Sequence, residues 1–213
     1  ASLNSFVKAQ ILSDTSLDFV ANTSPPYSVW AAAVLADSSV PPAQPPVLHR
    51  RFPQMDRVVH RRQGWSMALA MSSARVANYE SIRGENLHGW YTGDGMTYLY
   101  TPDLRQYSGD FWATIDPYRM PGTTVDSTPR APGSGEAYLS GEDWVGGADL
   151  LDQYGVSGMQ LSSWGAGLSA RKSWFFFDDE VVCLGSAIHG ISGRAVETVV
   201  ETRRLAAYGD NPL

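Results

Sequence analysis

The fold class is decided by one short stretch, Trp65-Ser66-Met67-Ala68-Leu69-Ala70-Met71, in which large and small residues alternate. A period of two places every second side chain on the same face of a β-strand. The same alternation returns at residues 96–100, which read Met-Thr-Tyr-Leu-Tyr. The two patterns predict strands with one bulky face, and therefore a sheet that packs against another layer.

Further strands are predicted toward the C-terminus. Residues 173–177 and 181–184 read Ser-Trp-Phe-Phe-Phe and Val-Val-Cys-Leu, and three acidic residues at 178–180 connect them as a turn. Residues 196–202 alternate once more, and residues 208–213 follow without a clear terminal element. Gly93-Asp94-Gly95 predicts a hairpin turn between residues 90–92 and the strand at 96–100. Together these patterns predict a large antiparallel sheet system.

The N-terminal part favours helix instead. Residues 1–39 include Ser24 and Pro25, a typical helix start, followed by the helix formers of residues 30–35. Residues 41–46 hold four prolines, which fit neither a helix nor a central strand. We therefore divide the chain into a helical part at 1–40, a proline-rich linker at 41–48 and a β domain at 49–213.

Composition limits the classes of function. The chain has 213 residues, 43% of them hydrophobic, and a net charge of −6, which argues against general nucleic-acid binding. No apolar run approaches the roughly 20 residues of a membrane span. The single cysteine, Cys183, excludes an internal disulfide and is predicted to be a buried strand residue. Ala1 in place of Met fits a processed product or an internal piece of a longer protein.

A basic cluster contrasts with the acidic chain. Residues 50–62 contain five arginines and a single acidic residue, Asp56. Such a cluster binds a polyanionic ligand or forms intramolecular ion pairs with acidic loops, and for any one arginine the ion pair is slightly favoured.

The richest stretch for chemistry is the polar loop at residues 78–89. It contains Glu80, Arg83, Glu85, Asn86 and His88 and leads into the strand at 96–100. A rigid sheet with a charged loop on its rim is how proteins hold extended polar ligands such as sugars.

This loop and its neighbours resemble polysaccharide lyase family 8, which contains hyaluronate, chondroitin AC and xanthan lyases; actinobacterial hyaluronate and chondroitin AC enzymes are the most similar in pattern. The matching segments are many and occur in a fixed order. They are Met55-Asp56-Arg57, residues 59–62, Tyr79-Glu80, Gly84-Glu85-Asn86, Gly89-Trp90, residues 93–96 and 98–100, Phe111-Trp112, residues 116–119 and 121–124, and Lys172-Ser173-Trp174-Phe175.

The resemblance implies a mainly β fold, an antiparallel super-sandwich preceded by the last helices of an α/α toroid. It implies β-elimination on an acidic glycosaminoglycan such as hyaluronan or chondroitin, giving unsaturated uronate products, in a secreted protein. No cofactor and no metal are implied. The expected partners are the anionic polysaccharide and the remaining portion of the same lyase, with no nucleic acid and no membrane. The main catalytic His and Tyr of the family belong to the toroid, and we find no counterpart of them here.

The resemblance also implies roles within the loop. Glu80 matches a supporting catalytic residue that orients an arginine or histidine. Arg83 stands where the family more often has Asn; it can pair with a uronate carboxylate or with Glu80 instead. Glu85 and Asn86 bind sugar hydroxyls or shape the loop.

Several alternatives remain at this point. A non-catalytic carbohydrate-binding β domain would use the same loop without turnover, and a xanthan-type lyase would act on another polymer. Trp90, Tyr91 and Tyr98 stack on sugar rings or belong to the core. His60 and His88 are general bases or, more often for such residues, paired or surface side chains.

Overall fold

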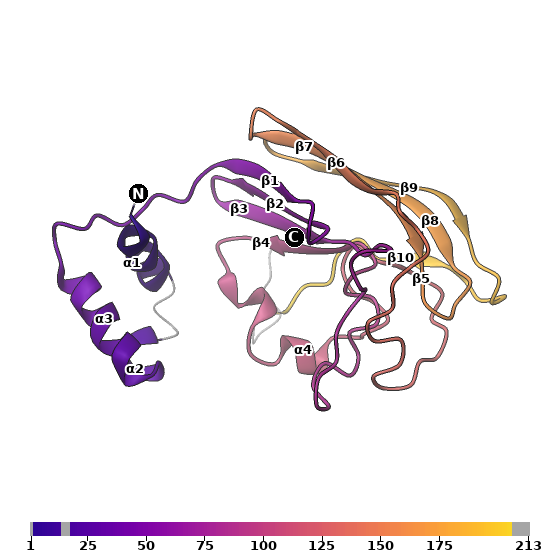
Figure 1. The fold of residues 1–213 in the computed structure, drawn as a ribbon, viewed down its shortest axis with the longest axis horizontal. Coiled ribbons are helices and arrows are strands. Elements are labelled where there is room, and N and C mark those ends of the chain that lie inside the picture. Colours follow the sequence, from indigo (N-terminus) through magenta and orange to yellow (C-terminus); the bar gives the residue numbers. More distant parts are fainter. Residues whose placement is uncertain (1, 14–17, 206–213) are drawn as a thin grey trace. The chain divides into compact units, whose positions relative to one another are not determined.

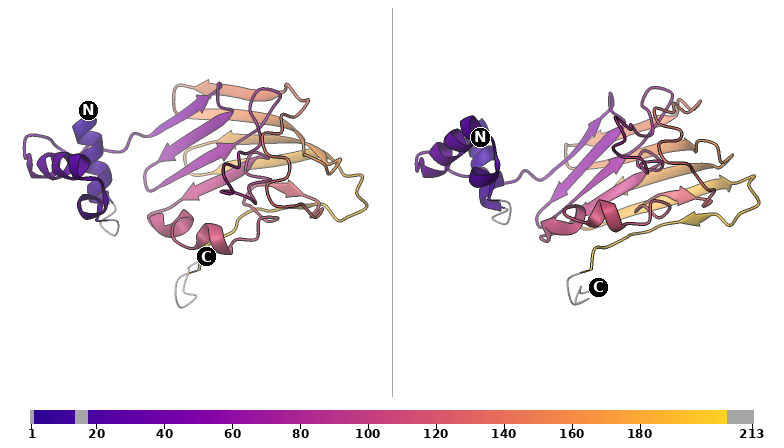
Figure 2. Two further views of the ribbon diagram at one scale, coloured as in Figure 1. Left: turned by 60° about the horizontal axis from the view of Figure 1, so that its bottom comes forward. Right: turned by 90° about the horizontal axis from the view of Figure 1, so that it is seen from below.

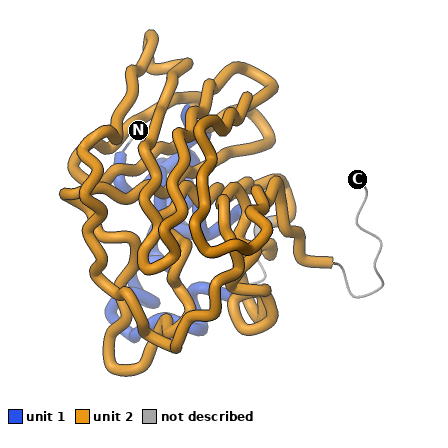
Figure 3. The backbone as a smooth tube through the Cα atoms, turned by 90° about the vertical axis from the view of Figure 1, so that its right-hand side faces the viewer, with its two compact units in different colours: residues 1–46 blue, residues 47–213 orange. Residues whose placement is uncertain are grey.

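The computed structural model describes residues 2–13 and 18–205. The chain divides into two compact units, residues 1–46 and residues 47–213, which Figure 3 shows in different colours. Each unit is described by itself.

The first unit is helical. Its helices are α1 (Leu3–Ser13), α2 (Phe19–Asn22) and α3 (Pro25–Ala36). Two prolines occupy the first turn of α3, where the missing backbone N–H groups cost nothing, and Asp37 ends the helix. The Lys8 ammonium of α1 donates a 2.7 Å hydrogen bond to the Asp37 carbonyl. The predicted helical segment is therefore confirmed, and its described residues form three helices; its assignment to the end of a toroid stays a prediction.

The second unit contains two four-stranded antiparallel sheets (Figures 1 and 2). The first has the order β1 (Leu48–Phe52), β2 (Arg57–Arg62), β3 (Trp65–Ala70) and β4 (Met96–Tyr100). The second has the order β6 (Val145–Leu150), β7 (Tyr154–Ser162), β8 (Ser169–Phe176) and β9 (Val181–His189). β5 (Thr124–Val125) pairs with β10 (Glu197–Thr198), and the short helices η2 (Leu104–Tyr107) and α4 (Phe111–Thr114) follow β4.

The core lies between the two large sheets, which face each other in Figure 2. The side chains that fill it come from both sheets and include the fully buried Trp174 and Phe176 of β8 and Leu69 of β3. Leu69 lies on the bulky face that alternation predicts for β3, and burial of such side chains is the main favourable contribution to folding. The mainly β antiparallel fold with a short N-terminal helical segment is thus confirmed.

The hairpin predicted at Gly93-Asp94-Gly95 is wrong. β4 pairs with β3, with Ala70 opposite Met96, so the residues between them form one long loop instead of a strand and a tight turn. Trp90 and Tyr91 are buried in that loop, and Gly93 packs against Asn78, where an added Cβ would lie 2.3 Å from the carbonyl oxygen. Residues 90–92 do not form a strand that pairs with β4. Burial of the two aromatic rings and the close backbone contact at Gly93 hold this part of the loop instead.

Two further predictions need correction. Of residues 196–202 only Glu197–Thr198 is a strand, although the Val199 N–H still donates to the Thr123 carbonyl. Cys183 lies in β9 as expected, but it is exposed. The reason is that β9 has β8 as its only partner among the described residues, so most of β9 remains open to solvent. Residues 208–213 lie outside the described residues.

Most of the basic cluster serves the fold. Ion pairs connect Arg50 with Asp152 at 3.7 Å, Arg51 with Asp149 at 3.7 Å, and Arg62 with Asp178 at 3.3 Å. These carboxylates belong to β6 and to the turns after β6 and β8, so the pairs join the two sheets. For these three arginines the interpretation as intramolecular ion pairs is therefore the correct one.

His60 is a buried core residue and not an accessible base. Its Nδ1 lies 3.2 Å from Nδ1 of the equally buried His49, and its Nε2 lies 2.8 Å from the Phe177 carbonyl oxygen. Burial, above all, lowers the pKa of His60 to about 4. The pair bridges the first sheet to the end of β8 and has no access to a substrate.

Candidate functional site

The polar loop starts from a fixed point at the end of β3. The buried Asp56 carboxylate accepts hydrogen bonds from the Ser73 hydroxyl at 2.6 Å and from the Arg75 guanidinium at 2.9 Å. The Met71 N–H donates to the Asp56 carbonyl. Asp56 has a positive φ of 49°, which its short polar side chain tolerates at the tight turn between β1 and β2. Through Asp56, the turn between β1 and β2 therefore fixes the first residues of the segment that follows β3.

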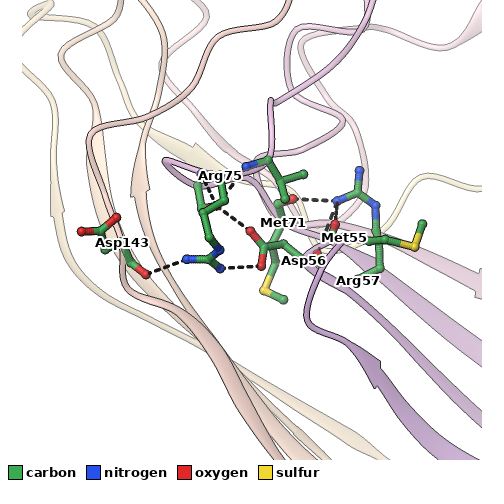
Figure 4. A network of polar contacts seen from close by, with 8 residues as sticks. Met55, Asp56, Arg57, Met71, Arg75 and Asp143 are labelled. Atoms are coloured by element: carbon green, nitrogen blue, oxygen red, sulfur yellow. Dashed lines mark hydrogen bonds and ion pairs between the residues drawn. The ribbon is translucent and has the colours of Figure 1, made fainter.

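Arginines extend this network to both sheets (Figure 4). The Arg57 guanidinium donates to the carbonyls of Met55 at 3.0 Å and Met71 at 2.7 Å, and Arg75 reaches the Asp143 carbonyl just before β6 at 3.5 Å. Charge-assisted hydrogen bonds of this kind are stronger than neutral ones. The loop thus leaves a scaffold that is tied to each layer of the sandwich.

A second segment, residues 131–138, braces the loop along its length. The Asn78 N–H donates to Tyr138, the Tyr79 hydroxyl donates to the Ser134 carbonyl, and the Ser81 N–H donates to the Glu136 carboxylate. The hydrogen bonds from Gly133 N–H to the Leu87 carbonyl and from the Trp90 indole to the Ala131 carbonyl complete the contact. Main-chain bonds on both sides give the loop a defined shape.

Three of the predicted site residues project from this loop into solvent. Glu80, Arg83 and Glu85 are exposed, and their charged groups have no ion pair or hydrogen bond within the described part of the chain. Arg83 therefore does not pair with Glu80. A reactive or binding group that has no internal partner is free to meet a ligand, but the roles of these residues stay predictions.

The Asn86 side chain makes its contacts within the polar loop. Its φ is 53°, and its side-chain amide donates a 2.8 Å hydrogen bond to the Glu80 carbonyl. The same side chain lies against Gly89, where a Cβ would come within 2.7 Å of it. Asn86 shapes the loop in this way and fixes the backbone of Glu80.

Beside the loop lies a hollow of about 650 Å³. One wall is residues 86–89 with Thr92, and the other is α4 and the segment after it, with Trp112, Ile115 and Met120. Trp112 is 47% exposed, and the His88 ring packs edge-on against Trp90. An exposed indole opposite polar loop residues is the arrangement that sugar-binding sites use, because a ring can stack while its hydroxyls find polar partners.

The structure brings only Asn86 of the four predicted site residues to this hollow. Trp112 is the main residue that the sequence analysis did not assign to the site. It appears there only in the family segment Phe111-Trp112, and its distance of more than 20 residues from the loop gave no reason to place the two together. Trp90 and Tyr91 are buried in the core, so they do not stack on sugar rings. Tyr98 is half-buried on the first sheet, where it lines a separate hollow of about 390 Å³.

A buried polar network supports the inner side of the loop. The Arg130 guanidinium donates to the Tyr91 hydroxyl at 2.9 Å and the Ser163 hydroxyl at 3.3 Å, and Ser163 donates to the Asp94 carboxylate at 3.1 Å. The Lys172 ammonium contacts the carbonyls of Asp94 and Gly122. Burial raises the pKa of Asp94 to about 6 and lowers that of Lys172 to about 8.

Across residues 2–13 and 18–205, no group of three His, Cys, Asp or Glu side chains is placed to hold a metal ion. Within the same residues, no helix has both the length and the apolar character needed to cross a membrane.

Comparisons with known proteins agree with this architecture. Residues 47–211 match the family model of the polysaccharide lyase family 8 super-sandwich domain. The chain is 48% identical over 211 residues to the xanthan lyase of Bacillus sp. (strain GL1), covering 99% of this chain and 22% of that protein. It is 45% identical over 181 residues to the hyaluronate lyase of Thermasporomyces composti, covering 84% of this chain and 23% of the relative.

A solved structure shows the same fold. The chondroitin AC lyase of Streptomyces coelicolor A3 in complex with chondroitin sulphate superposes with a TM-score of 0.92 at 39% identity, over 100% of this chain and 30% of that one. Together with the family model, these likenesses place the sandwich in the class of polysaccharide lyase β domains. More particularly, the chain belongs to polysaccharide lyase family 8. It spans less than a third of each of these relatives.

Proposed function

We propose that this chain forms one wall of the substrate cleft of a secreted lyase that cleaves uronate-containing polysaccharide by β-elimination. The observation that carries the proposal is the hollow beside the polar loop, where the exposed Trp112 stands opposite Asn86 and His88, in a member of this family.

The chemistry requires three contributions. The uronate carboxylate must be neutralised so that its neighbouring C5 proton becomes acidic. A base removes that proton, the C4–O bond breaks as the C4–C5 double bond forms, and an acid protonates the departing glycosidic oxygen. The products are a shortened chain and an unsaturated uronate.

Within this scheme the loop residues take supporting roles. Arg83 offers a planar guanidinium without an internal partner and would pair with the uronate carboxylate. Glu80 would orient a catalytic arginine or histidine from another part of the lyase, or stabilise the charged form of that residue. Glu85 and Asn86 would meet sugar hydroxyls, and Trp112 would stack on a neighbouring sugar ring.

The principal base and acid would come from the remaining portion of the lyase. The helices of residues 1–40 would be the end of its toroidal catalytic domain, and further β domains would follow. This division fits the finding that the chain covers 22% of the xanthan lyase and 30% of the chondroitin AC lyase chain.

Two substrate classes compete. A xanthan-type substrate is favoured by the 48% identity to a xanthan lyase, which extends over the helical residues as well as the β domain. A glycosaminoglycan such as hyaluronan or chondroitin is favoured by the hyaluronate lyase at 45% identity and by the chondroitin AC lyase. All three polymers therefore belong in the assay.

The test replaces the matching region of the Bacillus xanthan lyase with this chain and measures unsaturated uronate by ultraviolet absorbance on xanthan, hyaluronan and chondroitin. We expect product from the chimera and none from the isolated chain. Product from the isolated chain would show that base and acid lie within these residues. Binding of polysaccharide without product from either protein would favour a non-catalytic carbohydrate-binding domain.

Variants of the chimera assign the residues. Glu80→Gln should lower kcat by at least tenfold with little change in KM, and Arg83→Ala should raise KM and lower kcat, because Arg83 contacts the reacting uronate. Asp179→Asn, in the exposed turn between β8 and β9, is the matched control and should leave both constants unchanged. Equal losses in all three variants would contradict these roles.

A further inference from the structure

A second exposed indole of the β domain lies on the outer face of the second large sheet. Trp144 directly precedes β6 and is 59% exposed. Its carbonyl accepts a 2.9 Å hydrogen bond from the Gln160 N–H of β7, which fixes its backbone. The benzo edge of the indole lies over Gly158, where a Cβ would come within 2.5 Å of the ring. Glycine at this position is what lets the ring approach the sheet.

Strand alternation places polar groups around this indole. Met159 and Leu161 of β7 point into the core, so Gly158 and Gln160 point to the outer face. In the antiparallel register Gln160 stands opposite Arg171, and Gly158 stands opposite Ser173 of β8. Directly opposed side chains lie about 5 Å apart at Cβ, so the three polar side chains form one patch.

Two hollows flank the ring. One, of about 280 Å³, is bounded by Trp144, Val156, Gly158, Ser173 and the backbone around Gly146. The other, of about 250 Å³, is bounded by Trp144, Gln160 and Arg171. An aromatic platform with a shallow depression on each side can accept consecutive sugar units, each of which needs a face to stack on and an edge to hydrogen-bond.

The polar groups of this patch have no internal partners. Within the described residues, the Arg171 guanidinium, the Gln160 amide and the Trp144 indole N–H make no hydrogen bond or ion pair. This contrasts with Arg50, Arg51 and Arg62 of the first sheet, which pair with carboxylates. Asp143 borders the first hollow, so positive and negative charge stand at opposite ends of the patch.

We infer that the Trp144 patch is a second saccharide-binding site, separate from the cleft beside Trp112, and that its ligand is a segment of uronate-containing polysaccharide. The carboxylate would bind Arg171 in the smaller hollow, and neutral sugar hydroxyls would meet Asp143 and Ser173 in the other. The choice of a uronate polymer rests on the proposed function; the patch itself rests on the exposed indole and the unpaired cation. Such a site would hold a polymer on the enzyme between successive cleavages.

The test uses the 213-residue chain labelled with 5-fluorotryptophan, whose seven tryptophans give separate fluorine signals. The signal that disappears in Trp144→Phe is that of Trp144. Tetrasaccharides of hyaluronan and chondroitin and short xanthan fragments are titrated in turn, and chitotetraose serves as the neutral control. This measurement records binding and needs no turnover, so it stays interpretable if the proposed lyase activity fails.

We expect the Trp144 signal to move with at least one acidic oligosaccharide. Trp144→Ala removes the reporting indole, so its effect is measured by isothermal titration calorimetry in a Trp112→Ala background; it should weaken binding of the acidic oligosaccharide roughly tenfold, which corresponds to about 1.4 kcal/mol. Arg171→Gln should weaken the acidic ligand about threefold, as for an exposed ion pair, and leave the neutral one unchanged. Gly158→Ala should act like a mild form of Trp144→Ala, since it lifts the ring, whereas Trp112→Ala should leave the Trp144 titration unchanged.

Three results would overturn the inference. The first is a Trp144 signal that no acidic oligosaccharide moves. The second is equal movement by acidic and neutral ligands with no effect of Arg171→Gln. The third is a signal that follows protein concentration instead of oligosaccharide, which would assign the patch to contact between two copies of the chain.

Discussion

The buried histidine pair predicts that the sandwich loses stability in mild acid. His60 Nε2 lies against the Phe177 carbonyl oxygen, so this nitrogen carries the hydrogen and His60 Nδ1 accepts from His49 Nδ1. A proton added to His60 would place two N–H groups against each other at 3.2 Å. A proton added to His49 would instead face Asp149, whose carboxylate lies 3.4 Å from Nε2. His60 is therefore the member of the pair that resists protonation.

The sign and size of this stability change follow from the lowered pKa of His60. Burial lowers the pKa of His60 from its ordinary 6.5 to about 4, and burial also lowers that of His49. The unfolded chain then binds more protons than the folded chain between these values, so stability is full above pH 6.5 and is lost as the pH falls toward 4. The charged groups around the pair are Arg51, Arg62, Asp149 and Asp178.

Lowering the pKa of His60 from 6.5 to about 4 corresponds to about 3 kcal/mol in the free energy of unfolding, at about 1.4 kcal/mol per pH unit. Asp178 is 68% exposed, and solvent there screens part of the effect. Between pH 7 and pH 5 we expect a loss of about 1 to 2 kcal/mol in the free energy of unfolding from this site.

Equilibrium urea unfolding at pH 7, 6 and 5, followed by tryptophan fluorescence, measures this loss. His60→Gln keeps a donor for the Phe177 carbonyl but cannot titrate, so its stability should fall by about 1 to 2 kcal/mol less than that of the unaltered chain over the same range. His88→Gln, at an exposed position, should follow the unaltered chain. Because His60→Gln can also impair folding, the pKa of His60 is measured directly by NMR in the unaltered chain. A value near 6.5, or an unchanged pH dependence in a folded His60→Gln, would refute the reasoning.

Three further predictions concern the loop, its support and the open sheet edge. Gly93→Ala should destabilise the chain by about 2 to 3 kcal/mol in urea unfolding, because its Cβ would lie 2.3 Å from a backbone carbonyl, whereas Gly141→Ala meets no atom within 4 Å and should be nearly neutral. Arg130→Ala should cost about 2 kcal/mol, since it leaves the buried Tyr91 hydroxyl without a partner and takes one donor from the Ser163 hydroxyl; Arg194→Ala, at an exposed position, should change stability by less than about 0.5 kcal/mol. Light scattering should show association of the isolated chain through β9, where Leu184 is 55% exposed, and Leu184→Lys should reduce it; monomers of both proteins at every concentration would contradict this.

Sequence patterns were sufficient where a segment's role depends on its immediate neighbours. Alternation in residues 65–71 and 96–100 predicted β3 and β4, because which face of a strand is buried depends on a local period of two. The acidic turn between β8 and β9 and the prolines at the start of α3 were readable for the same reason. The short motifs around Glu80 and Asn86 were enough to suggest the family, which the comparisons then established.

Local patterns failed where distant segments compete for the same residues. Gly93-Asp94-Gly95 has the composition of a hairpin turn, yet β4 takes β3 as its partner and the two aromatic residues before the turn enter the core. Cys183 has apolar neighbours in sequence but lies on an edge strand that no further strand covers within the described residues. Pairing and burial of this kind depend on the whole sheet.

The sequence by itself determined the class of fold, the family and the charged loop, since each is written in residues that follow one another along the chain. Only the tertiary structure decided that His60 is buried against His49, that Asn86 and Trp112 border one hollow, and that Arg171 stands beside Trp144. The physical reason is that a site is formed by side chains from different strands and loops. Their distances are set by strand register and sheet packing, and neither is encoded in any single segment.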